Sequence, residues 1–218
     1  ILLSNGTFTV NSAGGAIVID GAISGSSDEA VVINSGASGG ATVELKGAIG
    51  GGNEIKNVTI TGTNGVTLTN ANITTSVTSG TSVEISGDIT LGSNITIDTN
   101  TANTANDGSI TINDKIDGTR QLVLDSGAGN IALQGAIGET NALTLLSVNS
   151  SNGADANIND GTIEIFNIGS ATNSAGADTG AISIGNKDTE TLTLDGTIYT
   201  TGEATIYETA TGNNILLT

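Results

Sequence analysis

The chain has 218 residues, of which 32 are glycine and four are aromatic, and it contains no proline, cysteine, methionine, tryptophan or histidine. Its core must therefore be aliphatic, which suits a narrow stacked core better than a β-sandwich, whose sheets lie about 10 Å apart and are usually filled with bulkier side chains. The net charge of −17, with only five dispersed lysines and arginines, argues against a nucleic-acid partner, because phosphate binding requires clustered cations.

Short runs that alternate apolar and polar residues recur along the chain. Each is typical of a half-buried strand of a few residues, bounded by a turn rich in glycine, asparagine, aspartate or serine. In chain order they include Thr42–Lys46, Ile110–Ile112, Ile163–Ile165 and Leu192–Asp195.

A stricter template, apolar-x-apolar-x-(Gly or Asp)-x-Ile, fits six places. They are Ile17/Ile19/Gly21/Ile23, Val43/Leu45/Gly47/Ile49, Val83/Ile85/Gly87/Ile89, Ile110/Ile112/Asp114/Ile116, Ile131/Leu133/Gly135/Ile137 and Leu192/Leu194/Gly196/Ile198. Their starts are separated by 26, 40, 27, 21 and 61 residues, which we interpret as one, two, one, one and three units of about 20 to 27 residues. Such a period predicts a solenoid.

The register is sharpest between residues 110 and 145, where five apolar residues recur 21 positions later. Strand starts at 110, 116 and 122 indicate three short strands per coil. We therefore predict an all-β fold, a right-handed parallel β-helix of roughly nine or ten coils that forms a single rod over residues 1–218, and we expect this rod to be a segment or module of a longer protein or filament. The shared template position predicts that Leu45, Ile85, Ile112 and Leu133 point inward.

Three polar stretches interrupt the repeat, at residues 98–108, 148–161 and 167–180. They are rich in asparagine, alanine, glycine and aspartate, and insertions in solenoids usually leave at the corners between strands. We predict that they are loops, and they are the first candidates for binding a partner.

The segments Leu122–Gly138 and Gly14–Ile23 resemble the repeats of filamentous-haemagglutinin-like exoproteins and autotransporter passenger domains of Gram-negative bacteria. The resemblance covers most of the chain and implies a fibrous, secreted adhesin or matrix protein at the bacterial cell surface. The chain departs from it in one respect, because the Asn-Pro motifs typical of a two-partner-secretion cap cannot occur in a proline-free sequence.

The sequence lacks two residue types on which many catalytic sites depend. Without histidine or cysteine, the chain cannot form a Ser-His-Asp triad, a thiol nucleophile or a typical zinc site. We predict that it is not an enzyme and assign no catalytic, cofactor-binding or metal-binding residue. Calcium could bridge carboxylates of neighbouring coils, but the sequence identifies no ligands.

Two alternatives stay open. The first is a polysaccharide lyase or glycoside hydrolase on a β-helix, which needs two suitably spaced carboxylates; Asp28/Glu29 and Asp155/Asp160 are pairs of this kind, although solvated loop residues explain them more simply. The second is an ice-binding solenoid, suggested by Thr-x-Thr pairs that do not follow the repeat: Thr7/Thr9, Thr59/Thr61, Thr67/Thr69 and Thr191/Thr193.

The run Gly50–Gly52 is interpreted as a corner and not as a phosphate-binding loop.

The two ends of the sequence are alike: Ile1–Ser4 and Ile215–Thr218 differ only in a serine-to-threonine change. Both tetrapeptides read as apolar strands. We expect the coils to self-associate head to tail into filaments, with a host or cell-surface glycan or protein as a further partner. No stretch approaches the roughly 18 apolar residues of a membrane span.

Overall fold

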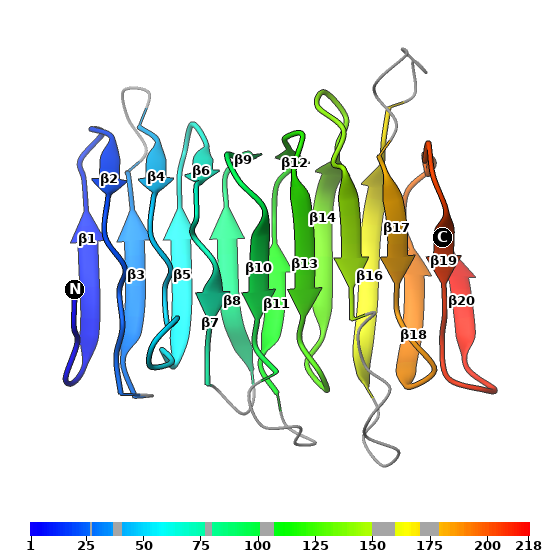
Figure 1. Cartoon of the computed structure of the whole chain (residues 1–218), viewed down its shortest axis with the longest axis horizontal. Coiled ribbons are helices and arrows are strands. Elements are labelled where there is room, and N and C mark those ends of the chain that lie inside the picture. The colour runs from blue at the N-terminus through cyan, green and yellow to red at the C-terminus, as the bar shows by residue number, and fades with distance from the viewer. Residues whose placement is uncertain (27, 37–40, 77–79, 101–106, 150–159, 171–178) are drawn as a thin grey trace.

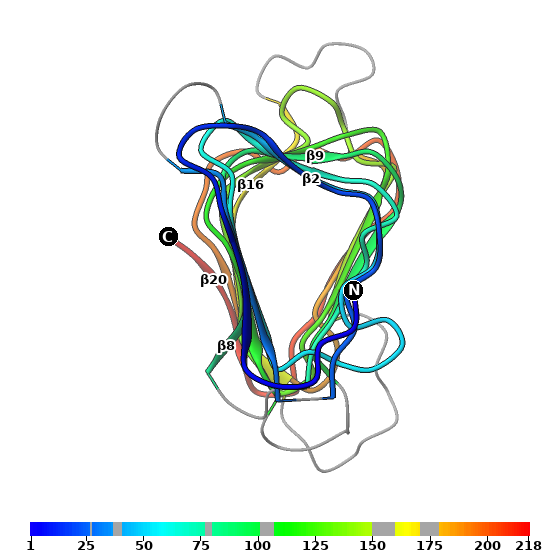
Figure 2. The same ribbon diagram turned by 90° about the vertical axis from the view of Figure 1, so that its left-hand side faces the viewer.

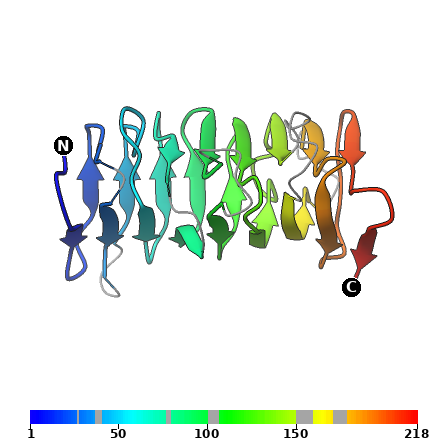
Figure 3. The ribbon, with the colours of Figure 1, turned by 90° about the horizontal axis from the view of Figure 1, so that it is seen from below.

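The computed structural model describes residues 1–26, 28–36, 41–76, 80–100, 107–149, 160–170 and 179–218. These residues form strands, bridges and turns and contain no helix, and every strand pairing among them is parallel. The strands stack along one axis as a β-solenoid, with the two ends of the chain at opposite ends of the rod (Figure 1, Figure 3). The sequence-based prediction of the fold class is confirmed.

Three faces enclose a roughly triangular core (Figure 2). The first face stacks β1 (Thr7–Asn11), β3 (Ala30–Asn34), β5 (Asn57–Thr61), β8 (Thr81–Ser86), β11 (Ser109–Ile112), the first parts of β14 (Ile131–Ile137) and β16 (Asp160–Ile168), β18 (Thr189–Leu194) and β20 (Asn214–Leu217). The second face stacks β2 (Ile17–Ile19), β4 (Val43–Leu45), β6 (Val66–Leu68), β9 (Ile89–Leu91), β12 (Ile116–Asp117) and the ends of β14 and β16.

The third face stacks β7 (Ile73–Thr74), β10 (Ile95–Asp98), β13 (Gln121–Asp125), β15 (Leu145–Val148), β17 (Ala181–Ile184) and β19 (Thr205–Tyr207). Viewed from the N-terminal end, the chain runs clockwise through the first, second and third faces as it recedes, so the coil is right-handed (Figure 2). We call the corner between the first and second faces the first corner, and the corner between the third and first faces the third corner.

Aliphatic side chains fill the interior in columns that run from coil to coil. In one column Ile85 pairs with Ile112, which pairs with Leu133. These three side chains and Leu45 are at most 1% exposed, so the predicted inward orientation of all four is confirmed. Removing this apolar surface from water supplies the main favourable free energy, at about 25 cal/mol per Å².

Leu45, however, belongs to another column. It lies on the second face and pairs with Ile19 and Leu68, whereas the template residues of β8, β11, β14 and β18 lie on the first face. The template therefore marks a strand-corner-strand unit and not one fixed place in the coil. The spacing of 40 residues is not two turns, because it connects two different faces.

The number of turns is slightly lower than predicted. Named strands occupy nine levels on the first face but only seven on the second and six on the third, so fewer turns are complete than the nine or ten coils expected. The interval from Ile131 to Leu192, interpreted as three units, holds only two steps, through Ile163. Those two steps include long polar insertions, so the repeat is longer there than its average.

The predicted loops fall largely outside the described residues, since 101–106, 150–159 and 171–178 are among the positions not described. Their flanking residues place the first two insertions at the third corner, after β10 and β15. The third insertion follows β16 and precedes β17.

Candidate functional site

Buried polar residues gather at the third corner. Thr75, Thr99, Ser126 and Asn186 each lie two residues after an inward residue of the third face, and each is at most 5% exposed. The Ser126 hydroxyl donates to the carbonyl of Gly129 at 2.6 Å. Such bonds close the turn toward the first face while satisfying groups that would be costly to bury alone.

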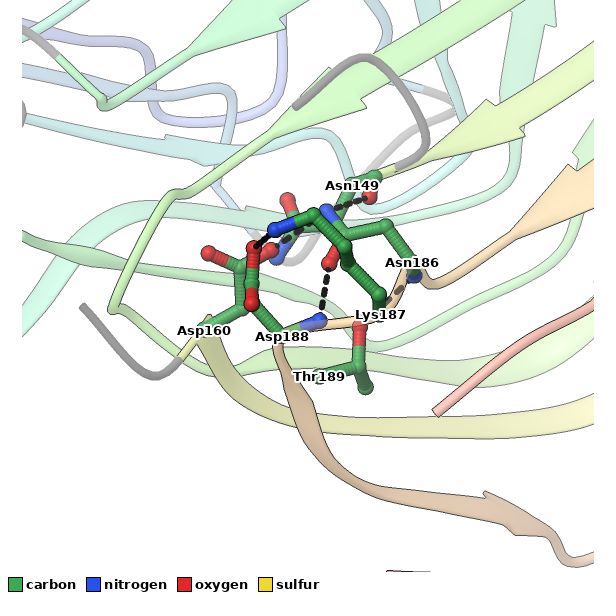
Figure 4. Close-up of polar contacts among 6 residues, drawn as sticks. All are labelled: Asn149, Asp160, Asn186, Lys187, Asp188 and Thr189. Carbon is green, nitrogen blue, oxygen red and sulfur yellow. Dashed lines mark hydrogen bonds and ion pairs between the residues drawn. The ribbon is translucent and has the colours of Figure 1, made fainter. Parts of the chain in front are cut away.

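Near the C-terminal end this corner becomes a side-chain network (Figure 4). Asn186 donates through Nδ2 to the Asn149 carbonyl and to Oδ2 of Asp160, both at 2.7 Å, and its backbone N–H donates to Thr189 Oγ1 at 3.0 Å. Its Oδ1 accepts from the backbone N–H of Asp188 at 2.8 Å. The Asn186 side chain thereby joins its own turn to two earlier segments of the chain, at Asn149 and Asp160.

Asp160 is 4% exposed, and its burial raises the pKa of the carboxyl to about 6. The hydrogen bond from Asn186 opposes this change, while the nearby charges of Asp188 and Asp125 add to it. Burial likewise raises the pKa of Asp98, and the negative charge of Asp125 raises this pKa further. Asp98 and Asp125 are paired in register, and both Asp98 and Asp160 are partly desolvated beside other carboxylates.

The first carboxylate pair singled out from the sequence is a turn element. Glu29 is fully buried, and its carboxylate accepts from the Ser26 N–H at 2.6 Å, the Ser26 hydroxyl at 2.7 Å and the Asp28 N–H at 3.3 Å. The backbone and side-chain hydrogen bonds from Ser26 lower the pKa of Glu29. In the second pair, Asp155 lies outside the described residues, and Asp160 belongs to the network above.

A polar hollow lies over the second face. It has a volume of about 350 Å³ and extends from Thr42 to Asn141, and we call it the axial groove. Outward residues of β6, β9 and β12 form its floor as one column, in which Thr67 pairs with Thr90 and Thr90 with Asp117. Asn64, Asp88 and Lys115 line its side at the first corner, where a second hollow of about 400 Å³ adjoins it.

The charged groups of the axial groove are held in place by local bonds. Asp117 Oδ1 accepts from the N–H groups of Thr140 and Asn141 at 2.9 and 3.0 Å. Lys115 Nζ lies 3.3 Å from Asp88 Oδ2, and the hydrogen bond and charge of Asp88 raise the pKa of this lysine. Two carboxylates and one cation thus lie together in the axial groove.

No local motif of the sequence marks this groove. Its lining residues lie in five consecutive coils, at residues 42, 64–67, 88–90, 115–117 and 140–141, so the signal was a repeat of 23 to 27 residues in polar positions. That signal could be read only with the correct phase of the coils.

The Thr-x-Thr pairs are more ordered than the sequence indicated. Thr9, Thr59 and Thr193 share one outward column of the first face. Glu84 and Glu164 occupy the same column in intervening coils. The column therefore does not present one Thr-x-Thr pair in every coil, as an ice-binding face would require. Gly50–Gly52 line a separate hollow of about 580 Å³ at the third corner, beside Ser26 and Glu54.

Among the described residues, no group of three or more acidic side chains is arranged to hold a metal ion. The same residues include no helix long and apolar enough to cross a membrane.

This geometry defines a β-solenoid repeat protein. A scan of protein-family models gives no match, and searches of the curated proteins and of the solved structures give none either.

Proposed function

We propose that the chain is a structural or adhesive segment of an extracellular bacterial fibre, surface layer or matrix, in which β-helix coils are stacked end to end. One observation carries the proposal: nearly all large apolar side chains exposed among the described residues lie at the two ends of the rod. They are Ile1, Leu2 and Val18 at one end and Ile206, Ile215, Leu216 and Leu217 at the other, with Phe166 as the exception two levels from the end.

Exposed apolar strands at a sheet edge favour pairing with further strands, because their N–H and C=O groups are unpaired and their side chains gain from burial. Leu192 and Leu194 of β18 pair with Ile215 and Leu217 of β20, so the last strand already continues the inward columns. A further coil would cover it in the same way. That coil can come from more of the same polypeptide or from another molecule.

The two similar tetrapeptides do not carry this argument. Leu2 bridges to Ser24 on the third face, whereas Ile215–Leu217 lie in β20 on the first face. Their likeness therefore does not mark equivalent places in the coil.

The resemblance to filamentous-haemagglutinin-like exoproteins supports the location at the bacterial surface. The acidic, hydroxyl-rich exterior also suits a well-hydrated extracellular fibre. Surface labelling of the producing cells with an antibody to the rod would test this location directly, and signal confined to lysed cells would contradict it.

The stacking is tested by sedimentation velocity and electron microscopy of the 218-residue chain over a range of concentrations. We expect rods that lengthen end to end with concentration. Leu217→Lys should block their growth, because it puts a charge on a strand edge, a device that natural proteins use against edge pairing.

The matched control is Thr111→Lys, which adds the same charge to an outward position in the middle of the first face. It should assemble like the parent. A parent chain that stays monomeric at high concentration would overturn the proposal, as would equal inhibition by both substitutions.

A further inference from the structure

The axial groove has the shape of a site for a linear polymer. Its lining residues come from five successive coils, at Thr42, Thr67, Thr90, Asp117 and Asn141. Coils repeat about every 4.8 Å, so the groove runs parallel to the rod for about 19 Å. A small ligand would contact one or two coils, whereas a chain molecule lying along the axis would meet the same kind of group at each level.

The chemistry of the lining selects among polymers. The floor and walls supply threonine hydroxyls, asparagine amides and carboxylates, which together donate and accept hydrogen bonds. Asp88 and Asp117 outnumber the single cation Lys115, which is already paired with Asp88. This balance repels polyanions, and a lining dominated by polar side chains offers little to an apolar peptide.

The groove is also preorganised. Asp117 is fixed by two backbone N–H donors, and in the adjoining hollow Asp114 accepts from the Gly87 N–H at 2.7 Å. Thr67 and Thr90 belong to strands that are paired on both sides, so the backbone pairing fixes the spacing of the two threonines. Groups that need no reordering lose less entropy when they bind.

From these observations we propose that the axial groove binds a linear, uncharged polysaccharide, whose hydroxyl groups bond to the threonine, asparagine and aspartate side chains of successive coils. The proposal concerns binding alone and is independent of the end-to-end assembly.

The test is a titration of the 218-residue chain, followed by NMR or calorimetry, with hexasaccharides of the cello-, xylo- and manno- series. Hexagalacturonate serves as the anionic probe. We expect at least one neutral hexasaccharide to bind more tightly than hexagalacturonate, and its disaccharide to bind at least about tenfold more weakly, because fewer coils are contacted.

The matched variants remove hydroxyls without changing side-chain size. Thr67→Val with Thr90→Val should weaken binding by about tenfold, since two hydrogen bonds are lost. Thr59→Val with Thr111→Val alters outward threonines of the first face and should leave the affinity within about twofold.

Three results would overturn the proposal. They are failure of every neutral hexasaccharide to bind at millimolar concentration, tighter binding of hexagalacturonate, and equal weakening by the two pairs of substitutions. Circular dichroism of the variants separates a loss of binding from a loss of folding.

Discussion

At the scale of single residues, the fold depends on stacked aliphatic side chains that have the same neighbours above and below. Leu133 lies between Ile112 and Ile165, and all three are at most 1% exposed. An interior of this kind has no polar group that could pair with a charge placed among these columns.

We therefore expect Leu133→Asp to destabilise the rod by roughly 3 to 5 kcal/mol, because an unpaired carboxylate would be buried between coils. Urea unfolding followed by circular dichroism measures the change. Ala132→Asp is the control: it points outward beside Glu164, and a mild like-charge repulsion should cost less than about 1 kcal/mol. If the two variants unfold at the same urea concentration, the inward assignment of Leu133 is wrong.

Asp160 illustrates the opposite case, a carboxylate that the fold buries. Its raised pKa means that the folded protein holds this proton more tightly than the unfolded chain, whose carboxyl has the ordinary value of 3.8. Between about pH 4 and pH 6 the folded state thus binds more protons, and stability falls as pH rises through that interval. Above pH 6 the full penalty, at most about 3 kcal/mol, is present.

Asp160→Asn removes this titration while keeping an oxygen acceptor for Asn186. We expect the difference in unfolding free energy, variant minus parent, to increase from pH 4 to pH 7 by up to about 3 kcal/mol. Denaturant curves at several pH values measure it. Because Glu29 and Asp98 are present in both proteins, their contributions cancel in this difference. If the unfolding free energies of the two proteins change in parallel with pH, Asp160 titrates as an ordinary carboxyl.

At the scale of elements, the corners explain the glycines of the template. A Cβ at Gly135 would lie 2.3 Å from the carbonyl carbon of Asp114 in the preceding coil, and one at Gly47 would lie 2.6 Å from the backbone of Gly21. Gly21 itself is in the first coil, and a Cβ there would meet nothing within 4 Å. The glycine is needed where one corner rests on another.

This contrast gives a matched pair of substitutions. Gly135→Ala should destabilise the protein by about 1 to 3 kcal/mol, since backbone of the neighbouring coil must move. Gly21→Ala occupies the same template position but should change stability by less than about 0.5 kcal/mol. Thermal unfolding of both variants tests the explanation, and equal losses would mean that corner packing does not determine the residue.

The corners also show where sequence reasoning succeeds and where it fails. Alternation of apolar and polar residues determines which side chains point inward, so Leu45 and Ile85 were both assigned correctly. The same local pattern occurs at the second face for Leu45 and at the first face for Ile85, because strand, corner and strand are chemically alike on each side of the coil. The face is decided by pairing between coils, which a local pattern does not contain.

At the scale of the whole molecule, this ambiguity of phase explains both the overestimated coil count and the unrecognised axial groove. The groove joins residues about 25 positions apart, and its column becomes visible only when Thr67, Thr90 and Asp117 are placed on one face. The exposed apolar ends follow from the stacking as well, because a column of identical coils leaves its first and last strands uncovered.

Net charge should regulate the proposed end-to-end assembly. Each 218-residue chain carries −17, and Asp and Glu are spread along the sequence, so two rods that approach end to end repel each other. The repulsion acts over about 30 Å at 0.01 M salt but over only about 10 Å at 0.1 M. Burial of Ile215 and Leu217, which continue the inward columns, is a short-range gain that such a change in salt hardly affects. We therefore expect the association constant, measured by sedimentation velocity, to rise severalfold between 0.01 and 0.1 M sodium chloride at pH 7. At pH 4.5, where part of the carboxylate charge is neutralised, the dependence on salt should be weaker. An association constant that falls as salt is added would show that ion pairs, and not apolar strands, hold the ends together.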